Sequence, residues 1–261
     1  MCTHDDRAAA SVAVAATDAG LNVAPADPAV IADLVTANHI LYDQGVVDAF
    51  GHVSVRHDKR ADCFLLARNM APGQVTADDI VTFTLDGAPL DARGRRVYLE
   101  RFIHGEIYRT RPDVMAVIHS HSHAIVPLTI SKQTRLRAVF HMAGFIGQCA
   151  PVFEIRDVAG PATDLLISSQ KLGAALADCL GASDIVLMRG HGSTVVAPTL
   201  PRVVYRAVYA EINARYQTEA MRMGDVIYLT PEECATTVKT IEAQVQRPWD
   251  LWTEQARAKR A

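Results

Sequence analysis

The pattern of apolar and polar positions alternates between long stretches typical of helices and short stretches typical of buried strands. Strands of this length lying between helices indicate an α/β fold in which helices cover a mixed, mainly antiparallel sheet. Apolar residues at helical spacing predict helices at 29–44, 98–109, 168–180 and 199–223, with a last helix from Pro231. Runs of β-branched and aromatic residues predict strands at 50–56, 63–67, 80–85, 114–118 and 184–189.

The composition of the chain changes near residue 24. Residues 1–24 are small, polar and rich in alanine, which predicts a partly ordered N-terminal arm. Residues 25–261 contain no internal repeat and no low-complexity tract. We therefore expect them to form a single domain.

A run at 114–124 combines an apolar strand with three histidines. Its first five residues, Val-Met-Ala-Val-Ile, predict a buried strand, and His119, His121 and His123 follow at alternate positions. Residues two apart on a strand point to the same face, so we expect three imidazoles side by side. First-row divalent metals bind neutral imidazoles that are held on a rigid support. The run therefore predicts a metal site.

Two residues outside this run are predicted to join it. The helix at 98–109 ends in a turn at 111–113 and the strand follows directly, so the helix start should return Glu100 towards the histidines. Downstream, the strand at 184–189 leads into Gly190-His191-Gly192, where two glycines let the backbone bend tightly around an imidazole. We expect His191 to be a further ligand.

Composition and charge exclude several classes of function. The chain is 49% hydrophobic and 21% charged, which is ordinary for a soluble globular protein. Its formal net charge of −3 disfavours nucleic acid or an anionic membrane as the main partner. There is no apolar run of the roughly 18 residues that a membrane span needs and no signal-peptide pattern, so we expect a cytoplasmic protein. The five cysteines form no Cys-x-x-Cys pair, which predicts free thiols.

Four blocks of sequence together resemble the class II aldolase/adducin family. They are residues 49–56 (Ala-Phe-Gly-His-Val-Ser-Val-Arg), Glu100, residues 119–121 (His-Ser-His) and residues 188–192 (Met-Arg-Gly-His-Gly). Each block alone is weak, but the set occurs in family order and spacing between about residue 31 and about residue 223. The resemblance implies a three-layer α/β/α sandwich and a catalytic domain at 25–261.

The resemblance also implies a metal centre and an assembly. His119, His121 and His191 would be the metal-binding triad. Glu100 would be the carboxylate that acts as an acid/base or as a fourth, displaceable ligand. The expected cofactor is a divalent metal ion, with zinc preferred and manganese, cobalt or iron as alternatives. A homotetramer with sites at subunit interfaces would be the assembly.

The phosphate site of the sugar-phosphate aldolases in this family is not matched here. Those enzymes hold phosphate with an Asn after the first strand's glycine, a Thr-Gly pair after the second strand, and two serines before the glutamate. The corresponding positions are His52, 69–70 (Asn-Met) and 98–99 (Tyr-Leu). A non-phosphorylated, flat acid bound by stacking and by a guanidinium–carboxylate pair is expected instead. The predicted substrate-binding residues are His52, Arg68, Asn69, Tyr98 and His123; a solvated loop charge remains the alternative for Arg68.

The family aldolases carry a proton-donating tyrosine in a His-Tyr-Met string, and the corresponding string here is Phe140-His141-Met142. His141 is the nearest match to that tyrosine. An imidazole exchanges protons near neutral pH, whereas a phenol has an unperturbed pKa of about 10. We therefore predict an acid/base role for His141, with a purely structural role as the alternative.

These observations predict a divalent-metal-dependent carbon–carbon lyase that acts on a non-phosphorylated hydroxy or oxo carboxylate. Decarboxylation of a hydroxyaromatic acid and aldol-type cleavage are both compatible with the residues, and the sequence does not decide between them; the family that the chain resembles includes members that decarboxylate hydroxyphthalate-type acids. An Fe(II)-dependent oxygenase on an aromatic oxo or hydroxy acid is one alternative. A non-catalytic, adducin-like interaction module is the other.

Overall fold

A seven-stranded sheet forms the centre of the computed structural model, which describes residues 24–260. The strand order is β3-β2-β1-β4-β7-β6-β5. All neighbouring pairs are antiparallel except β5 with β6, which is parallel, so the sheet is mixed and mainly antiparallel as predicted. The strands are β1 (His52–Arg56), β2 (Cys63–Ala67), β3 (Ile80–Thr84), β4 (Ala116–Ser120), β5 (Val152–Phe153), β6 (Ile185–Met188) and β7 (Gly192–Ala197).

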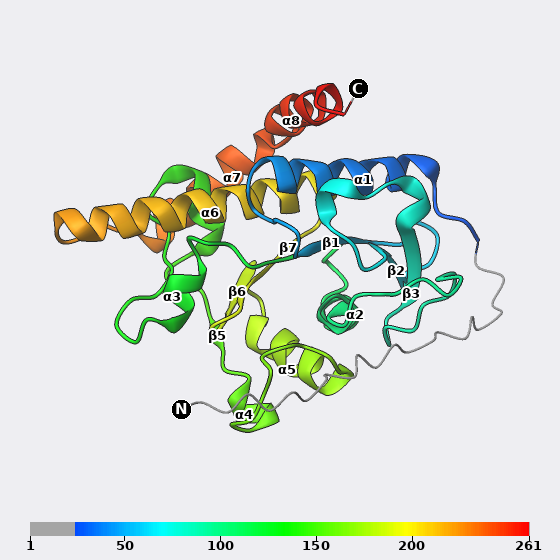
Figure 1. Cartoon of the computed structure of the whole chain (residues 1–261). Coiled ribbons are helices and arrows are strands. Elements are labelled where there is room, and N and C mark those ends of the chain that lie inside the picture. The colour runs from blue at the N-terminus through cyan, green and yellow to red at the C-terminus, as the bar shows by residue number, and fades with distance from the viewer. Residues whose placement is uncertain (1–23, 261) are drawn as a thin grey trace, which may run out of the picture.

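Helices cover both faces of this sheet (Figure 1). Helices α1 and α6 lie together on one face with α8 outside them, and α2 and α5 pack against each other on the opposite face. The predicted α/β/α sandwich is confirmed. The helices are α1 (Pro28–Asp43), α2 (Arg101–Thr110), α3 (Val126–Ile130), α4 (Arg156–Ala159), α5 (Gln170–Leu180), α6 (Leu200–Met223), α7 (Pro231–Ile241) and α8 (Gln246–Ala258), with short 3-10 helices η1 (Pro72–Gln74), η2 (Ala77–Asp79), η3 (His141–Ile146) and η4 (Glu242–Gln244).

Local signals in the sequence begin the two long helices. The Asp27 side chain accepts a hydrogen bond from the Ala29 N–H, and Pro28 is the first residue of α1. Thr199 caps α6 in the same way by accepting from the Arg202 N–H. Both helices then present apolar faces to the sheet, whose central strands β1 and β4 are buried along their whole length.

Helix α2 differs from its prediction in a way that matters for the site. It begins at Arg101 rather than at residue 98, because residues 99–100 form a turn and Glu100 takes the N-cap position with ψ of 18°. The Glu100 side chain makes no capping hydrogen bond to its own helix. Its carboxylate is therefore available to groups outside the helix.

The C-terminal part of the chain is helical. Residues 247–252, which include both tryptophans, lie inside α8. Trp249 and Trp252 are buried against the same chain, and the Trp252 ring lies 6.4 Å from that of Tyr209 on α6. Both tryptophan side chains are thus covered within one chain.

Other expectations about the whole chain have mixed outcomes. The predicted arm, apart from Ala24, falls outside the described residues, and the single domain at 25–261 stays a prediction. Four cysteines in the described part of the chain are free thiols, as expected. Across residues 24–260, no helix combines the length and the apolar character needed to cross a bilayer.

Candidate active site and metal centre

The central strands of the sheet bring distant histidines to one place. Strand β4 lies between β1 and β7, so His119 pairs across the sheet with His52 on one side and with Thr194 on the other. The hairpin between β6 and β7 carries His191 at its tip, next to the end of β4. This hairpin requires glycine: Gly190 has φ of +65°, and a Cβ on Gly192 would lie 2.0 Å from the Ser120 carbonyl oxygen.

Four potential ligand atoms converge at this edge of the sheet. The Nε2 atoms of His119 and His121 are 3.1 Å apart, and those of His121 and His191 are 3.0 Å apart. Glu100 Oε2 lies 3.6 Å from His119 Nε2 and 3.5 Å from His191 Nε2. Ligands at about 2.0–2.1 Å from a tetrahedral metal ion lie about 3.3 Å from one another. The predicted set of three histidines and Glu100 therefore has the spacing of a metal centre.

Hydrogen bonds outside the cluster orient its members. The Ser193 carbonyl lies 3.1 Å from His119 Nδ1, which must donate to it and therefore leaves the Nε2 lone pair facing the cluster. Glu100 Oε1 accepts the Ile167 backbone N–H at 3.0 Å, which turns Oε2 towards the imidazoles. Each contact fixes an orientation that a metal ligand needs.

The electrostatics of the cluster favour the protonation states that metal ligands need, namely neutral imidazoles and an ionised carboxylate. Burial lowers the pKa values of the His119 and His121 imidazoles, so both remain neutral near pH 7. For Glu100, burial raises the pKa, but the facing imidazoles of His119 and His191 lower it by more, and the net pKa lies below the ordinary value. The carboxylate is therefore ionised, and the imidazoles are free to donate lone pairs.

A cavity of about 420 Å³ opens onto this cluster. Glu100 and His121 form its inner end, and the rings of Tyr98 and His52 lie 4.7 Å apart in its wall. Burial raises the pKa of Tyr98 to about 12, so its phenol is neutral and donates a hydrogen bond to the Met70 carbonyl. The complete lining is Ala49, Phe50, Gly51, His52, Asn69, Met70, Ala71, Tyr98, Leu99, Glu100, His121 and Leu166.

The predicted substrate-binding residues divide into two groups. His52, Asn69 and Tyr98 line the cavity, as expected. Arg68 does not line it, because its Nε lies 2.6 Å from the Asp79 carboxylate and the two form an ion pair. The guanidinium expected to hold a substrate carboxylate is thus engaged elsewhere.

His123 is separated from the other histidines, so the expectation of three imidazoles on one face is wrong. Strand β4 ends at Ser120, and the Ser122 side chain accepts the Ile125 N–H in a turn that leads into α3. The alternation of an extended strand therefore stops before His123, whose side chain is exposed. Only His119 and His121 of this run belong to the cluster.

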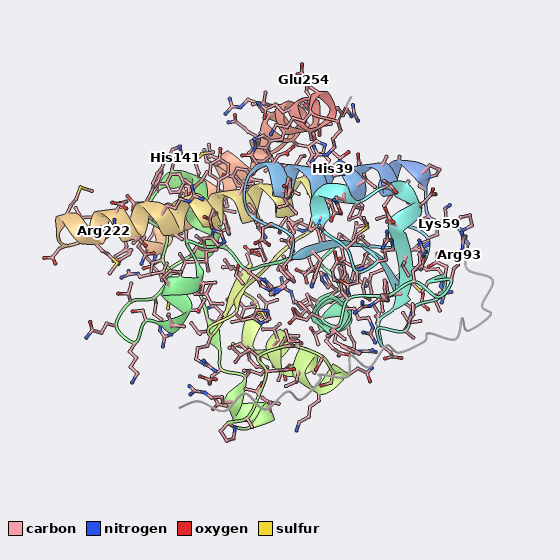
Figure 2. All side chains as sticks on the ribbon, in the orientation of Figure 1. His39, Lys59, Arg93, His141, Arg222 and Glu254 are labelled. Carbon is pink, nitrogen blue, oxygen red and sulfur yellow. The ribbon has the colours of Figure 1, made fainter. Side chains whose placement is uncertain are left out.

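His141 also lies apart from the metal-type cluster. It lines a second cavity of about 550 Å³ together with Tyr205, Tyr209, Arg247 and Trp252. It is the first residue of η3, which packs against α7, and it is labelled in Figure 2. Within one chain, the structure does not bring His141 into the cavity that contains Glu100.

A buried chain of hydrogen bonds, which we did not predict, leads from the cavity wall into the core. His52 Nδ1 lies 2.6 Å from His104 Nε2, and His104 Nδ1 lies 2.6 Å from Ser54 Oγ. Ser54 Oγ is also 2.8 Å from the Tyr108 hydroxyl. The available signal was the spacing of His104 and Tyr108, which lie four residues apart and so share one side of α2.

Comparison with known proteins shows the family. A sequence model described as "Class II Aldolase and Adducin N-terminal domain" matches residues 32–218, well over half of the chain. The chain belongs to the class II aldolase and adducin family. The resemblance noted from the four sequence blocks is thereby confirmed.

Individual relatives agree with this assignment. The chain is 38% identical over 244 residues to "Decarboxylase tropJ" of Talaromyces stipitatus, covering 85% of this chain and 91% of the relative. It is 25% identical over 213 residues to "3,4-dihydroxyphthalate decarboxylase" of Arthrobacter keyseri, covering 76% and 82%. Among solved structures, "L-fuculose 1-phosphate aldolase" superposes with a TM-score of 0.69 at 22% identity, covering 83% and 98%, which shows the shared fold.

The chain is accordingly an enzyme of the lyase class, as predicted. A non-catalytic, adducin-like module is no longer needed as an explanation of the sequence. Such a module can dispense with metal ligands, whereas all four candidate ligand residues are present here and their side chains lie together.

The cluster predicts that His119→Ala will abolish stoichiometric metal binding. Losing one of three imidazoles leaves too few neutral nitrogen ligands for a closed site. Metal content after purification and zinc loading, measured by inductively coupled plasma mass spectrometry, tests this. The matched control is His123→Ala, at the exposed histidine outside the cluster, which should retain its metal; equal metal content in both variants would contradict the site.

The buried chain predicts an acid-sensitive contribution to stability. Burial, assisted by nearby His119, lowers the pKa of His104 to about 3, below the value of about 6.5 in the unfolded chain. Between these values the unfolded state binds the proton and the folded state does not. The free energy of unfolding should therefore fall by about 1.4 kcal/mol per pH unit from this residue as pH drops below 6.

Urea unfolding of the metal-free protein at several pH values between 4.5 and 6 measures this slope. His104→Gln should show a shallower slope than the wild type by about the amount that His104 contributes. His123→Gln, at an exposed position, should keep the wild-type slope. Identical slopes for His104→Gln and the wild type would exclude a neutral, buried His104.

Proposed function

We propose that this protein is a metal-dependent decarboxylase of a non-phosphorylated hydroxyaromatic acid. The observation that carries the proposal is a cavity with aromatic walls that is lined by Glu100 and His121, two members of the cluster of three imidazoles and one carboxylate. No lysine or arginine is among the described residues that line it, whereas phosphate sites commonly use such cations. The decarboxylases named among its relatives support this substrate class.

The residues of the cluster fit a divalent cation, with His119, His121 and His191 as ligands and Glu100 as a possible fourth. Zinc suits three neutral imidazoles in tetrahedral geometry, and manganese, cobalt or iron remain possible. A bound cation would act as a Lewis acid, stabilising negative charge on a chelated substrate oxygen and supplying the positive charge that the cavity walls lack.

The cavity walls would hold the substrate ring and keep water away from it. Tyr98 and His52 provide flat faces on one side, and Phe50 and Leu99 lie at the exposed rim. A planar acid between them would direct its carboxylate and neighbouring hydroxyl towards Glu100 and the three imidazoles. Orientation of this kind lowers the activation barrier because the reacting groups are already aligned.

Glu100 is the residue that we propose moves the proton. In decarboxylation the bond between the ring carbon and the carboxylate breaks, carbon dioxide leaves, and the electron pair stays on the ring. Glu100 Oε2 would take the proton of the substrate hydroxyl and pass it to that carbon, and the resulting phenolate would then take a proton from water. The ionised state of Glu100 suits the first of these transfers.

The Glu100→Gln variant should therefore lose activity while it keeps most of its metal. The amide retains the shape and the hydrogen bond from Ile167, but it cannot carry the proton, and general acid–base contributions are typically about 10²–10⁴-fold. Carbon dioxide release from a panel of hydroxybenzoates and hydroxyphthalates, followed anaerobically, measures kcat. Glu219→Gln, at an exposed glutamate on α6, is the control.

Two outcomes would contradict this proposal. Full activity in Glu100→Gln would remove Glu100 from the reaction. Turnover of the same acids only when oxygen is present, with oxygen uptake, would favour the iron-dependent oxygenase, since two histidines and a carboxylate can also hold ferrous iron.

We also propose that the chain assembles as a homotetramer, which the sequence resemblance implies. Phe50 and Leu99 at the cavity rim are 66% and 53% exposed, which is unusual for large apolar side chains beside a binding site and is compatible with cover by another chain. An acid/base role for His141 would require such a second chain, because His141 and Glu100 line different cavities.

Light scattering coupled to size exclusion tests the assembly directly. The expected mass is that of four chains of 28.4 kDa. A mass of 28.4 kDa at micromolar concentration would contradict both the tetramer and the catalytic role of His141.

A further inference from the structure

The buried hydrogen-bond chain behind His52 has no part in the reaction described above. Its members come from two elements, with Ser54 beside His52 on β1 and His104 beside Tyr108 on α2. The exposed fraction is 4% for His52, 1% for Tyr108, and 0% for both Ser54 and His104. Water therefore does not reach the inner members, and each must find its hydrogen-bond partner within the chain.

The protons of this chain can be assigned from its inner end. Burial raises the pKa of the Tyr108 phenol, so Tyr108 keeps its proton, and its side-chain partner is Ser54 Oγ. If Tyr108 donates to Ser54, the Ser54 hydroxyl is free to donate to His104 Nδ1.

His104 then completes the assignment at the cavity wall. Because its Nδ1 accepts, the neutral His104 imidazole carries its proton on Nε2 and donates it to His52 Nδ1. The opposite direction would leave the phenol O–H unpaired in the core, which is costly for a buried donor.

The outer end of the chain lies in the substrate cavity. With Nδ1 accepting, a neutral His52 carries its proton on Nε2, and within the described residues the side-chain hydrogen bond of His52 is the one through Nδ1. His52 lines the cavity, and its ring lies 5.1 Å from that of the cluster residue His119.

We propose that Tyr108, Ser54 and His104 form a positioning relay that holds His52 as its Nε2–H tautomer, so that the cavity presents one fixed N–H donor to an anionic oxygen of the substrate. The substrate oxygen would be a carboxylate or phenolate oxygen, and this part rests on the proposed function. Without the relay, His52 could equally present a bare nitrogen, which repels such an oxygen. The relay thus favours substrates that place a hydrogen-bond acceptor next to His52 Nε2.

The tautomer of His52 can be measured without turnover. Long-range ¹H–¹⁵N spectra of zinc-loaded protein labelled with ¹⁵N-histidine distinguish a protonated from an unprotonated ring nitrogen. We expect His52 to be protonated at Nε2 and not at Nδ1. A wild-type protein with His52 protonated at Nδ1 would overturn the proposal.

A pair of substitutions at His104 separates the relay from simple packing. His104→Leu removes the donor to His52 Nδ1, so His52 should populate both tautomers. His104→Gln keeps a carbonyl that accepts from Ser54 and an amide N–H that donates to His52, so the wild-type tautomer should persist. Should His104→Leu fail to fold, Ser54→Ala breaks the same chain with a smaller change in volume.

Binding of 3,4-dihydroxybenzoate to the zinc-loaded proteins, measured by calorimetry, gives a second readout. His104→Leu should weaken binding about tenfold, as expected for loss of one hydrogen bond to a charged group, while His104→Gln stays within about twofold of wild type. Zinc content should be the same in all three proteins. Equal weakening in both variants, or an unchanged tautomer in His104→Leu, would overturn the relay.

These measurements also keep the relay distinct from the proposed reaction. A wild-type protein with the Nε2–H tautomer, sensitive to His104→Leu, supports the relay even if no hydroxyaromatic acid is decarboxylated. That second result would count against the proposed function alone.

Discussion

The approach of His121 Nε2 to within 3.1 Å of His119 Nε2 and 3.0 Å of His191 Nε2 is the constraint on which the rest of the site depends. Such an arrangement is useful only if the rings are neutral and their lone pairs face one point. Burial keeps the His119 and His121 rings neutral, and the Ser193 carbonyl fixes the tautomer of His119. The ionised carboxylate of Glu100, held from behind by the Ile167 N–H, completes the group.

The sheet is what makes this arrangement rigid. His119 is the second-to-last residue of a central strand whose neighbours on both sides pair with it, and His191 sits on a hairpin that approaches the Ser120 carbonyl closely enough to require glycine. Ligands carried by paired strands lose little conformational entropy when a metal ion binds, because their backbones are already fixed. The long covering helices contribute by burying both faces of these strands.

Two kinds of polar group serve the same cavity in different ways. The cluster gathers ionisable groups at one end, while the wall is made of neutral rings whose protons are assigned by hydrogen bonds that run into the core. Neutral walls suit a flat, partly apolar ligand, and the ionisable groups are concentrated at one end of the cavity. At His52 and Tyr98, which correspond by sequence resemblance to phosphate-holding positions of the family's sugar-phosphate aldolases, this chain has rings that shape the cavity wall.

Local sequence was sufficient for the elements and for the ligands that lie at their ends. Strand and helix periodicity, the Asp27-Pro28 cap and the Gly-His-Gly turn each act over a few residues, so the sheet and the cluster of His119, His121, His191 and Glu100 could be predicted. The position of His123 depended instead on where strand pairing stops, and that of Arg68 on an ion pair with Asp79. The contact between His52 and His104 joins a strand to a helix across 52 residues. Only the tertiary structure decides such contacts, because they depend on how elements pack and not on the pattern within any one of them.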